Sequence, residues 1–513
     1  MPQHRLERDP LGPVQVPDAA YYGAQTARAL DNFPISGLRP HAALVRATIV
    51  IKMACADANG SLGRLPDDVA GAITRACREV LRGGLRDQFV VDVYQAGAGT
   101  SHNMNANEVL ANRAEELLGG KRGAYARVHP NDHVNMGQST NDVFPTATRL
   151  AILIHHGALV DAAGELAGAL EAHAVRWTRV LKTGRTHLQD AVPITLGQEF
   201  SGWAANIRVA VEDLEHAASR LQELNLGATA VGTGLNAGSD FTAAAVANIA
   251  RETGFEVRPA ANHFRVTQSM GDVAAWSAAM RRLAMETNKI ASDLRLLASG
   301  PRAGIAEVIL PAVQPGSSIM PGKVNPSIPE MVNQVCYQVY GCDAAVAAAA
   351  DNGQLELNVM MPVMAWNALH ASAILTSALV VFRERCIDGL EADEERCREL
   401  LDRSTALATA LSPYIGYAAT ADIAKASVAT GRPIRELVLE RGLLDKKAAE
   451  RILSPEAMTE PGVTGEAGEA GEAGAKNVRG NDGGRADRVR KPGVRAGARR
   501  TRTPVPARRP RRP

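Results

Sequence analysis

FSGWAANIRVAVEDLEHAASRLQEL, residues 200–224, is the stretch that most clearly sets the fold class. Its apolar residues recur at steps of three and four with no proline between them, which predicts a long helix. Comparable patterns occupy four further stretches, 149–181, 266–299, 329–350 and 363–386. Helices of roughly 20 to 35 residues are much longer than the globular average, and abundant alanine allows them to pack closely. These patterns predict an all-α, mainly helical protein built around a long central bundle.

The apolar residues of these stretches lie on more than one side of each predicted helix. This distribution indicates burial against other subunits as well as within one chain. The sequence has no G-x-G-x-x-G segment after a strand and no Walker motif, so it does not support a nucleotide-binding fold.

Composition places the chain among ordinary globular proteins, because 46% of its 513 residues are hydrophobic and 22% are charged. Its six cysteines form no C-x-x-C pair, which argues against a zinc site and favours buried, reduced thiols. The start of the chain has no signal-peptide pattern, and the most apolar run, residues 371–382, is too short to span a bilayer. We therefore expect a cytoplasmic protein without membrane contact.

The C-terminal tail, residues 461–513, differs sharply from the rest of the chain. It holds 14 Lys and Arg against 5 Asp and Glu, whereas the remainder holds 43 against 50. Its GEA repeat and its Gly, Pro and Arg content predict disorder, since few large apolar residues offset the ordering entropy. Clustered arginine attracts nucleic acid, but a solvated extension with nonspecific electrostatics is the simpler interpretation.

Two polar segments interrupt the helical pattern early in the chain. QAGAGTSHNMNANEVLANR, residues 95–113, presents Thr100 after glycines that allow close backbone approach, and three asparagines follow. Taken alone, it also fits a capped helix start. QSTND, residues 138–142, places several hydrogen-bonding side chains directly before a predicted helix. A helix N-terminus with such side chains favours a carboxylate, although simple capping would give the same pattern.

Two further polar segments follow. GRTHLQDAVPITLGQEF, residues 184–200, carries Thr186 and His187 between helical stretches, and a lone histidine is a weak signal. GSSIMPGKVNPSIPEMVNQV, residues 316–335, is a glycine- and proline-rich loop with one lysine directly before a helix. Such a loop is typical of a mobile catalytic lid.

Together the four segments offer threonine, serine and asparagine side chains and one ammonium group, but no Cys/His metal cluster. A site of this kind suits a small dicarboxylate, because one cation and several neutral donors balance two negative charges. The sequence therefore predicts a dicarboxylate site without a metal or another cofactor.

The same segments resemble those of a known family. GSSIMPGKVNP resembles the signature loop of the fumarase/aspartase superfamily, and GAGTSHNMN, QSTND and GRTHLQDAVPITLGQEF resemble its other motifs in the same order. The resemblance runs from about residue 21 to about residue 459. It implies a homotetramer in which each active site draws residues from three subunits. It also implies reversible elimination from a succinyl substrate to give fumarate, without a redox cofactor.

The resemblance further implies a subunit of three helical regions and a role for each site residue. The expected regions are 1–140, a central bundle at 141–395 and a small domain at 396–460, followed by the tail. The expected catalytic residues are Ser317 as the base, His187 and Glu330. The expected substrate-binding residues are Thr100, Ser139, Thr140, Asn141, Thr186, His187, Ser318, Lys323 and Asn325.

Two branches of the family remain open, because members eliminate either ammonia or water. Hydratases of the family usually read GSGT and SSND, whereas this chain has Ala98 in GAGT and Thr140 in STND. VNQVC, residues 332–336, and GQLELNVMMPV, residues 353–363, also look like the ammonia-lyase branch. His187 occurs in both branches and does not decide between them. We therefore expect ammonia elimination, with the hydratase as the alternative.

Overall fold

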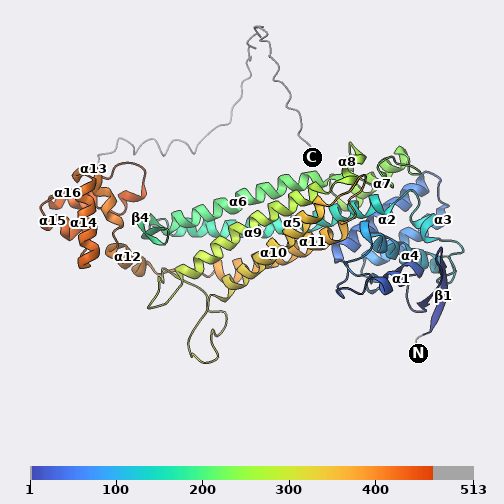
Figure 1. Cartoon of the computed structure of the whole chain (residues 1–513), viewed down its shortest axis with the longest axis horizontal. Coiled ribbons are helices and arrows are strands. Elements are labelled where there is room, and N and C mark those ends of the chain that lie inside the picture. The colour runs from blue at the N-terminus through green and yellow to red at the C-terminus, as the bar shows by residue number, and fades with distance from the viewer. Residues whose placement is uncertain (1–2, 466–513) are drawn as a thin grey trace, which may run out of the picture. The chain divides into compact units, whose positions relative to one another are not determined.

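The computed structural model describes residues 3–465 (Figure 1). The predictions of disorder and nucleic-acid contact concern the tail, residues 461–513. Its residues beyond position 465 lie outside the described part of the chain. Within the described part of the chain, helices dominate and the only sheets are four two-stranded pairs. The prediction of a mainly helical fold is confirmed.

The centre of this part of the chain is a bundle of long helices, which pack side by side in Figure 1. They are α5 (Thr140–Arg176), α6 (Leu196–Leu221), α9 (Gly271–Leu297), α10 (Ser327–Asp351) and α11 (Met361–Phe382), which continues into a π-helical turn, Arg383–Ile387. One hydrophobic cluster runs through all five helices. The bundle predicted from the helical periodicity is therefore present.

Two of the predicted helical stretches differ most from the structure. Helix α5 begins nine residues before position 149 and ends at Arg176, because the chain then enters a β-hairpin instead of continuing to position 181. The stretch 266–299 is not one helix but part of α8 (His263–Gln268) followed by α9. The break comes where Ser269 adopts an extended backbone.

The N-terminal region packs on the end of the bundle where α5 begins. Its elements are β1 (His4–Asp9), β2 (Gly12–Pro17), α1 (Ala24–Asn32), α2 (Ala42–Ser61), α3 (Asp67–Leu81) and α4 (Thr100–Leu117), with short helical turns at Arg86–Gln88, Gly97–Gly99 and Pro130–Val134. A second hydrophobic cluster, centred on α2, α3 and α4, forms its core.

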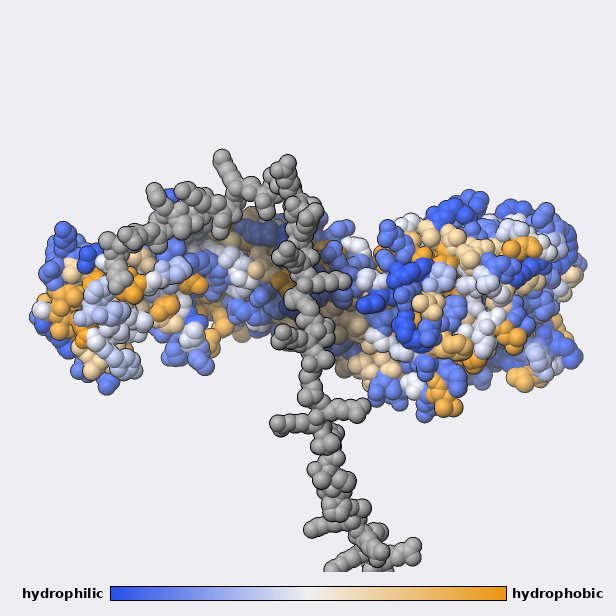
Figure 2. Space-filling model, turned by 90° about the horizontal axis from the view of Figure 1, so that it is seen from above, coloured by the Kyte–Doolittle hydropathy of each residue, from blue (hydrophilic) through white to orange (hydrophobic). Residues whose placement is uncertain are grey.

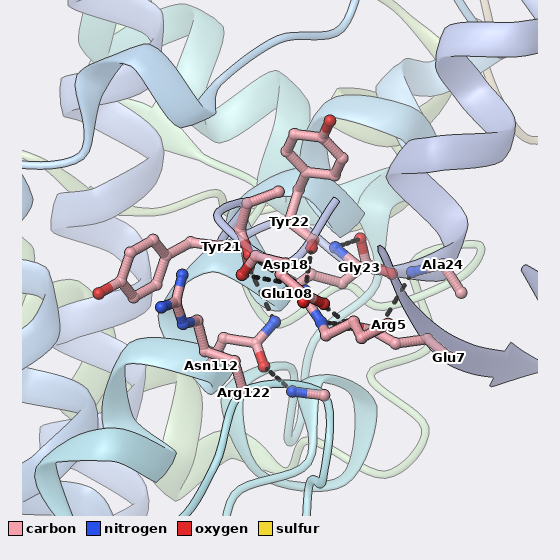
Figure 3. A network of polar contacts seen from close by, with 12 residues as sticks. Arg5, Glu7, Asp18, Tyr21, Tyr22, Gly23, Ala24, Glu108, Asn112 and Arg122 are labelled. Atoms are coloured by element: carbon pink, nitrogen blue, oxygen red, sulfur yellow. Dashed lines mark hydrogen bonds and ion pairs between the residues drawn. The ribbon is translucent and has the colours of Figure 1, made fainter. Parts of the chain in front are cut away.

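A buried carboxylate fixes α1 on α4 (Figure 3). Glu108 accepts hydrogen bonds from the N–H groups of Gly23 (2.8 Å) and Gln25 (2.8 Å) and from the hydroxyl of Thr26 (2.6 Å). The N-cap residue Gly23 has no side chain to cap α1, so Glu108 caps it from another helix. Beside it, Glu7 accepts from Ala24 N–H (3.2 Å), which ties the β1–β2 hairpin to the same point.

The remaining elements lie at both ends of the bundle, those of residues 223–259 at the end where α5 begins and the others at its far end. They are β3 (Leu181–Thr186) paired with β4 (Gln189–Thr195), β5 (Glu223–Leu224) with β6 (Arg258–Pro259), β7 (Val308–Ile309) with β8 (Glu391–Ala392), α7 (Ser239–Thr253), α12 (Glu394–Arg403), α13 (Ser412–Ile415), α14 (Tyr417–Thr430), α15 (Ile434–Glu440), α16 (Lys446–Ile452) and the turns Ala406–Leu411 and Ala457–Thr459. A third, small hydrophobic cluster lies within α13 to α16 and the preceding turn. The three clusters follow the order of the three expected regions, whose exact boundaries stay a prediction.

All six cysteines are free and buried, as predicted. By length and composition, α5 and α11 with its extension are apolar enough to cross a membrane, and half of each apolar window is buried inside the fold. Core helices of a bundle pass the same test, so length and composition alone are weak evidence of a membrane span.

The bundle helices also expose large apolar side chains. Val209 of α6, Met285 of α9 and Tyr337 of α10 are 41%, 50% and 56% exposed. Figure 2 shows apolar residues, in orange, scattered among hydrophilic ones over one face of the described chain. Exposed apolar side chains on these helices agree with the multi-sided pattern of the sequence, and their contact with other subunits stays a prediction.

Candidate functional site

Thr100, Ser139, Thr140 and Asn141 come together at one end of the bundle. Thr100 is the first residue of α4, and Thr140 is the first residue of α5. The two helix starts are joined by a hydrogen bond of 3.1 Å from Asn103 Nδ2 to Thr140 Oγ1. Two helix N-termini thus place unpaired N–H groups and hydroxyls in one place, which favours a bound carboxylate.

The Gly97–Gly99 turn brings Thr100 to this position. Ala98 and Gly99 have φ angles of 59° and 83°, so the backbone reverses tightly before α4. A Cβ at Gly99 would lie 2.1 Å from Cδ2 of Phe144 on α5. Only glycine therefore allows the turn to rest on α5, and this contact sets the spacing between Thr100 and Asn141.

The early start of α5 depends on a distant asparagine. Pro145 lies inside the helix and lacks the N–H that would bond to the carbonyl of Asn141. Asn225 Nδ2 donates to that carbonyl instead, at 3.1 Å. The replacement bond lets the helix begin at Thr140, where its first turn presents the predicted binding residues.

Asp142 completes the capping of α5 from a fully buried position. Its carboxylate accepts hydrogen bonds from the N–H groups of Ser139 (2.9 Å), Gly227 (3.0 Å) and Thr229 (3.0 Å). Burial raises the pKa of Asp142 to about 7, even though the three N–H donors and nearby Lys52 oppose the shift. The carboxylate ties the 227–229 loop to the helix start and so holds Ser139 in place.

Thr186 and His187 lie at the tip of the β3–β4 hairpin, near the opposite end of α5. The two turn residues, His187 and Leu188, have φ angles of 55° and 60°. Such turns normally use asparagine and glycine, so two larger side chains here indicate a strained turn of functional value. Both side chains are exposed, and Leu188 is 71% exposed.

A buried cluster of ion pairs anchors this hairpin to the chain segment that precedes the loop of residues 316–326. Glu307, directly before β7, has a fully buried side chain that contacts Lys182 (3.1 Å) and Arg185 (2.9 Å) of β3. Lys182 also contacts Glu199 of α6 at 2.8 Å. Burial alone lowers the pKa of Lys182, but the two carboxylates outweigh it and raise the pKa, so the ammonium stays charged. The cluster thus fixes the base of the hairpin against the chain segment that leads to the loop.

The loop with the predicted base has a closed neck and an exposed tip. Asn325 Nδ2 donates to Gly316 O (2.8 Å), and Gly316 N–H donates to Lys323 O (2.7 Å). Ser317 Oγ accepts hydrogen bonds from the N–H groups of Ile319 (3.2 Å) and Met320 (3.0 Å). Two backbone donors on one hydroxyl oxygen are the arrangement that stabilises an alkoxide.

The other predicted residues of this end make few contacts within one chain. Lys323 and Ser318 are exposed, and Lys323 forms no ion pair with any residue of 3–465. Glu330 lies in the first turn of α10 and forms no hydrogen bond with His187 in the described chain. Ile319, at the loop tip, is 83% exposed. Within residues 3–465, no other part of the chain covers this apolar tip.

The two groups of predicted residues lie far apart in one chain. Helix α5 has 37 residues, and at about 1.5 Å per residue its ends are roughly 55 Å apart. Thr140 stands at its start, whereas Thr186 follows its end. One chain therefore brings together Thr100, Ser139, Thr140 and Asn141, and separately gathers the hairpin and the loop stem.

The structure adds two supporting residues that sequence reasoning missed, Asp142 and Glu307. Asp142 stands three positions after Ser139, and this capping-box spacing is a signal that identifies it. Glu307 has no local signal, because its partners lie more than a hundred positions earlier in the chain. Within residues 3–465, no group of three or more His, Cys, Asp or Glu side chains is arranged to hold a metal ion.

Comparison with known proteins agrees with this architecture. A family model described as lyase matches residues 12–341, and a model of the fumarase C C-terminus matches residues 407–460. An aspartate ammonia-lyase of Pseudomonas aeruginosa is 49% identical over 460 residues, covering 89% of this chain and 97% of that protein. A class II fumarate hydratase of Halobacterium salinarum is 50% identical over 464 residues, covering 90% and 98%.

Solved structures show the same fold. A fumarate lyase:delta crystallin from Brucella melitensis, bound to cobalt, has a TM-score of 0.86 and 49% identity over 90% of this chain and all of that one. A class II fumarase from Schistosoma mansoni has a TM-score of 0.87 and 37% identity over 89% and 99% of the two chains. With matches of this extent, the chain is a lyase and belongs to the fumarase/aspartase superfamily.

Proposed function

We propose that the chain is an aspartate ammonia-lyase, which eliminates ammonia from L-aspartate to give fumarate. The observation that carries the proposal is the uncharged donor set at the paired N-termini of α4 and α5. Thr100, Ser139, Thr140 and Asn141 supply hydroxyls, an amide and helix N–H groups without a nearby exposed carboxylate. Such a set suits a carboxylate whose charge grows during the reaction.

The ammonia-lyase is preferred over the hydratase for two reasons. Ala98 and Thr140 replace the serines usual in GSGT and SSND of the hydratases. Relatives named aspartate ammonia-lyase come from Pseudomonas, Bacillus and Escherichia coli at 44% to 49% identity. The Halobacterium hydratase, at 50% identity, keeps class II fumarate hydratase as the alternative.

In the proposed mechanism, Ser317 acts as the base. Its alkoxide takes the proton from Cβ of aspartate, and the N–H groups of Ile319 and Met320 stabilise that alkoxide before the transfer. The electron pair of the broken C–H bond moves into the adjacent carboxylate, which becomes a doubly charged aci-carboxylate. Thr100 and the Ser139–Asn141 turn bind this growing charge, so they stabilise the transition state more than the substrate.

Collapse of the aci-carboxylate completes the elimination. The electron pair returns to form the Cα=Cβ double bond, the Cα–N bond breaks, and its electron pair leaves with ammonia. A protonated amine departs without a strong acid, so Thr186 and His187 need only position it, with Glu330 orienting His187. Lys323 and Asn325 hold the other carboxylate, and Ser318 supports the closed loop.

The active site is proposed to form in a homotetramer, with residues from three subunits. The roughly 55 Å length of α5 supports this arrangement, because no single chain spans the gap with its own side chains. The exposed apolar residues of α6, α9 and α10 and the uncovered loop tip support it as well. A cytoplasmic location is also proposed, in keeping with the six free cysteines.

One absorbance assay tests the reaction. Purified protein receives L-aspartate, L-malate or argininosuccinate, and fumarate formation is followed in the ultraviolet. Rapid release from L-aspartate alone is the expected result. Release from L-malate alone would assign the hydratase instead, and release from argininosuccinate alone would remove both.

A mixing experiment tests whether subunits share a site. Chains disabled at the loop by Ser317→Ala are refolded together with chains disabled at the helix start by Asn141→Ala. If each site takes these residues from different subunits, an equal mixture regains roughly a quarter of the wild-type activity by random assembly. If one chain supplied both residues of a site, every site would carry one of the two substitutions, and the mixture would regain no activity.

A further inference from the structure

Lys52 is a buried cation that the proposed mechanism does not use. It lies on α2 with no exposed surface and forms no ion pair with any described carboxylate. Burial lowers its pKa to about 8, partly opposed by Cys55 and Asp142, so the ammonium is largely protonated at neutral pH. A buried charge without an ion-pair partner is costly, and its contacts therefore need an explanation.

The contacts of Lys52 lead to the turn before α5. Its Nζ donates to Asn135 Oδ1 and to Gln138 Oε1, both at 2.9 Å. An ammonium group only donates hydrogen bonds, so the amide atoms that face it must be oxygens. Lys52 thereby fixes which way the two amides point, and Asn135 Nδ2 is left to hold the turn by donating to Gln138 O at 3.1 Å.

The fixed orientation passes from Asn135 to Thr140. Asn135 Oδ1 also accepts hydrogen bonds from Nδ2 of Asn103 and of Asn107, both at 3.2 Å. The other N–H of Asn103 donates to Thr140 Oγ1 at 3.1 Å. Thr140 thus receives a hydrogen bond and donates none to any described residue, so its own hydrogen is free to reach a ligand.

Two buried oxygens show that this orientation is enforced. Oδ1 of Asn103 and Oδ1 of Asn107 have no partner within residues 3–465. An unpaired buried acceptor costs about 1–3 kcal/mol, and turning the amides over is the obvious way to relieve it. Turning either amide would set its oxygen against Asn135 Oδ1, which Lys52 holds in place.

We propose that Lys52 is a positioning residue for the substrate carboxylate. Through Asn135 and Asn103, it sets the direction of hydrogen bonding at Thr140, so that the threonine hydroxyl donates to the carboxylate. The inference rests on the proposed function, since it deepens the role of that same donor set. Lys52 touches no substrate and acts through Thr140.

A double-mutant cycle tests this coupling. Lys52→Met is an unbranched replacement, one atom shorter, that removes the donors, and Thr140→Val removes the hydroxyl but keeps its shape. Lys52→Met is expected to raise KM about 10-fold with a smaller change in kcat. We call the hydrogen bonds from Lys52 through Asn135 and Asn103 to Thr140 the relay. In the Thr140→Val background, Lys52→Met is expected to change KM less than about twofold, because the relay then lacks the threonine hydroxyl. Equal KM factors in both backgrounds would overturn the proposal.

Asn59→Leu is the matched control. Asn59 lies on the same helix, is buried, and donates to Met136 O (3.0 Å) of the same turn, but it does not contact the relay. Its replacement should lower the thermal midpoint and change KM by the same factor in both backgrounds. If Lys52→Met does not fold, Asn103→Leu replaces it, because this variant removes the hydrogen bond to Thr140. The proposal then requires Asn103→Leu to raise KM in the wild-type background and to change it less than about twofold in the Thr140→Val background.

The cycle separates this proposal from the proposed reaction. KM is measured with L-aspartate or L-malate, whichever the wild type consumes. If it consumes neither, the proposed function fails, and the cycle is measured as binding of succinate by calorimetry. If Lys52→Met and Thr140→Val weakened succinate binding independently, the role of Lys52 would be refuted. If Lys52→Met had little effect once Thr140 was replaced, the role would be supported.

Discussion

The two ends of α5 solve different problems. At its start, the predicted binding residues are held by buried and part-buried hydrogen bonds from α4, the 227–229 loop and Asn225. At its far end, Ser317 lies on an exposed loop and His187 lies at an exposed hairpin tip. Only the segments that lead into the loop and the hairpin are held by buried ion pairs. We therefore expect the first end to be the more rigid part of the proposed carboxylate site, and the exposed loop and hairpin tip to be the more mobile part.

This difference indicates which part of the site moves. A receptor that stabilises growing charge works best when its dipoles do not rearrange during the reaction. A base that must exclude water and then release product requires opening and closing. We therefore expect rigidity at the start of α5 and mobility at the loop, and substitutions at the two ends should differ in effect.

The largest effect is expected from Ser317→Ala. Loss of the base should reduce kcat by about 10³-fold or more, while the N–H groups of Ile319 and Met320 turn to water in the exposed loop. Steady-state kinetics and the sedimentation of the assembly give the two readouts. Turnover within about 10-fold of wild type in an intact assembly would move the base elsewhere.

The next largest effect is expected from Glu307→Gln. Removing this buried carboxylate leaves Lys182 and Arg185 without full compensation, which should cost about 3–5 kcal/mol of stability. A drop in the thermal midpoint and a loss of kcat measure how far the β3–β4 hairpin has lost its attachment. Glu171→Gln is the control, because its pair with Arg208 is exposed and worth at most about 1 kcal/mol. Similar midpoints for the two variants would show that the cluster does not anchor the hairpin.

A milder effect is expected from Lys323→Ala. Lys323 is exposed on the loop and unpaired among the described residues, so its loss costs little stability. The missing charge at the second carboxylate should raise KM by about 10- to 30-fold, with kcat changed less. Titration of initial rates against substrate measures both constants. An unchanged KM would remove Lys323 from the carboxylate site.

The long helices and the four polar segments were predictable because they depend on local periodicity and composition. QSTND marked a helix start, but the periodic stretch was predicted only from position 149, because Pro145 argues against a helix before it and the compensating Asn225 lies 84 positions from Asn141. The hairpin under His187 was missed for a related reason. Its tip holds His187 and Leu188 instead of the asparagine and glycine that announce such a turn.

The grouping of the site residues was only partly predictable. The motif order implied one site, but the separation of Thr140 from Thr186 follows from the 37-residue length of α5, which the sequence pattern underestimated at its start. Contacts that join distant positions, such as Glu307 with Lys182, leave no periodic trace in either segment. Side-chain identity thus revealed the chemistry, whereas tertiary packing decided which residues meet.

The smallest effect is expected from the buried carboxyl at the rigid end. Because burial raises the pKa of Asp142 to about 7, the folded chain holds a proton there that the unfolded chain loses near pH 4. Its contribution to stability is therefore largest at low pH and is lost as the pH rises through about 7. Asp142→Asn cannot ionise, so the gap in thermal midpoint between wild type and variant should narrow, by the equivalent of about 1–2 kcal/mol, between about pH 5.5 and 7.5. Thermal melts across that range measure the gap. A gap that stayed constant over that range would mean that Asp142 is ionised throughout, and the three N–H donors would then outweigh burial at the start of α5.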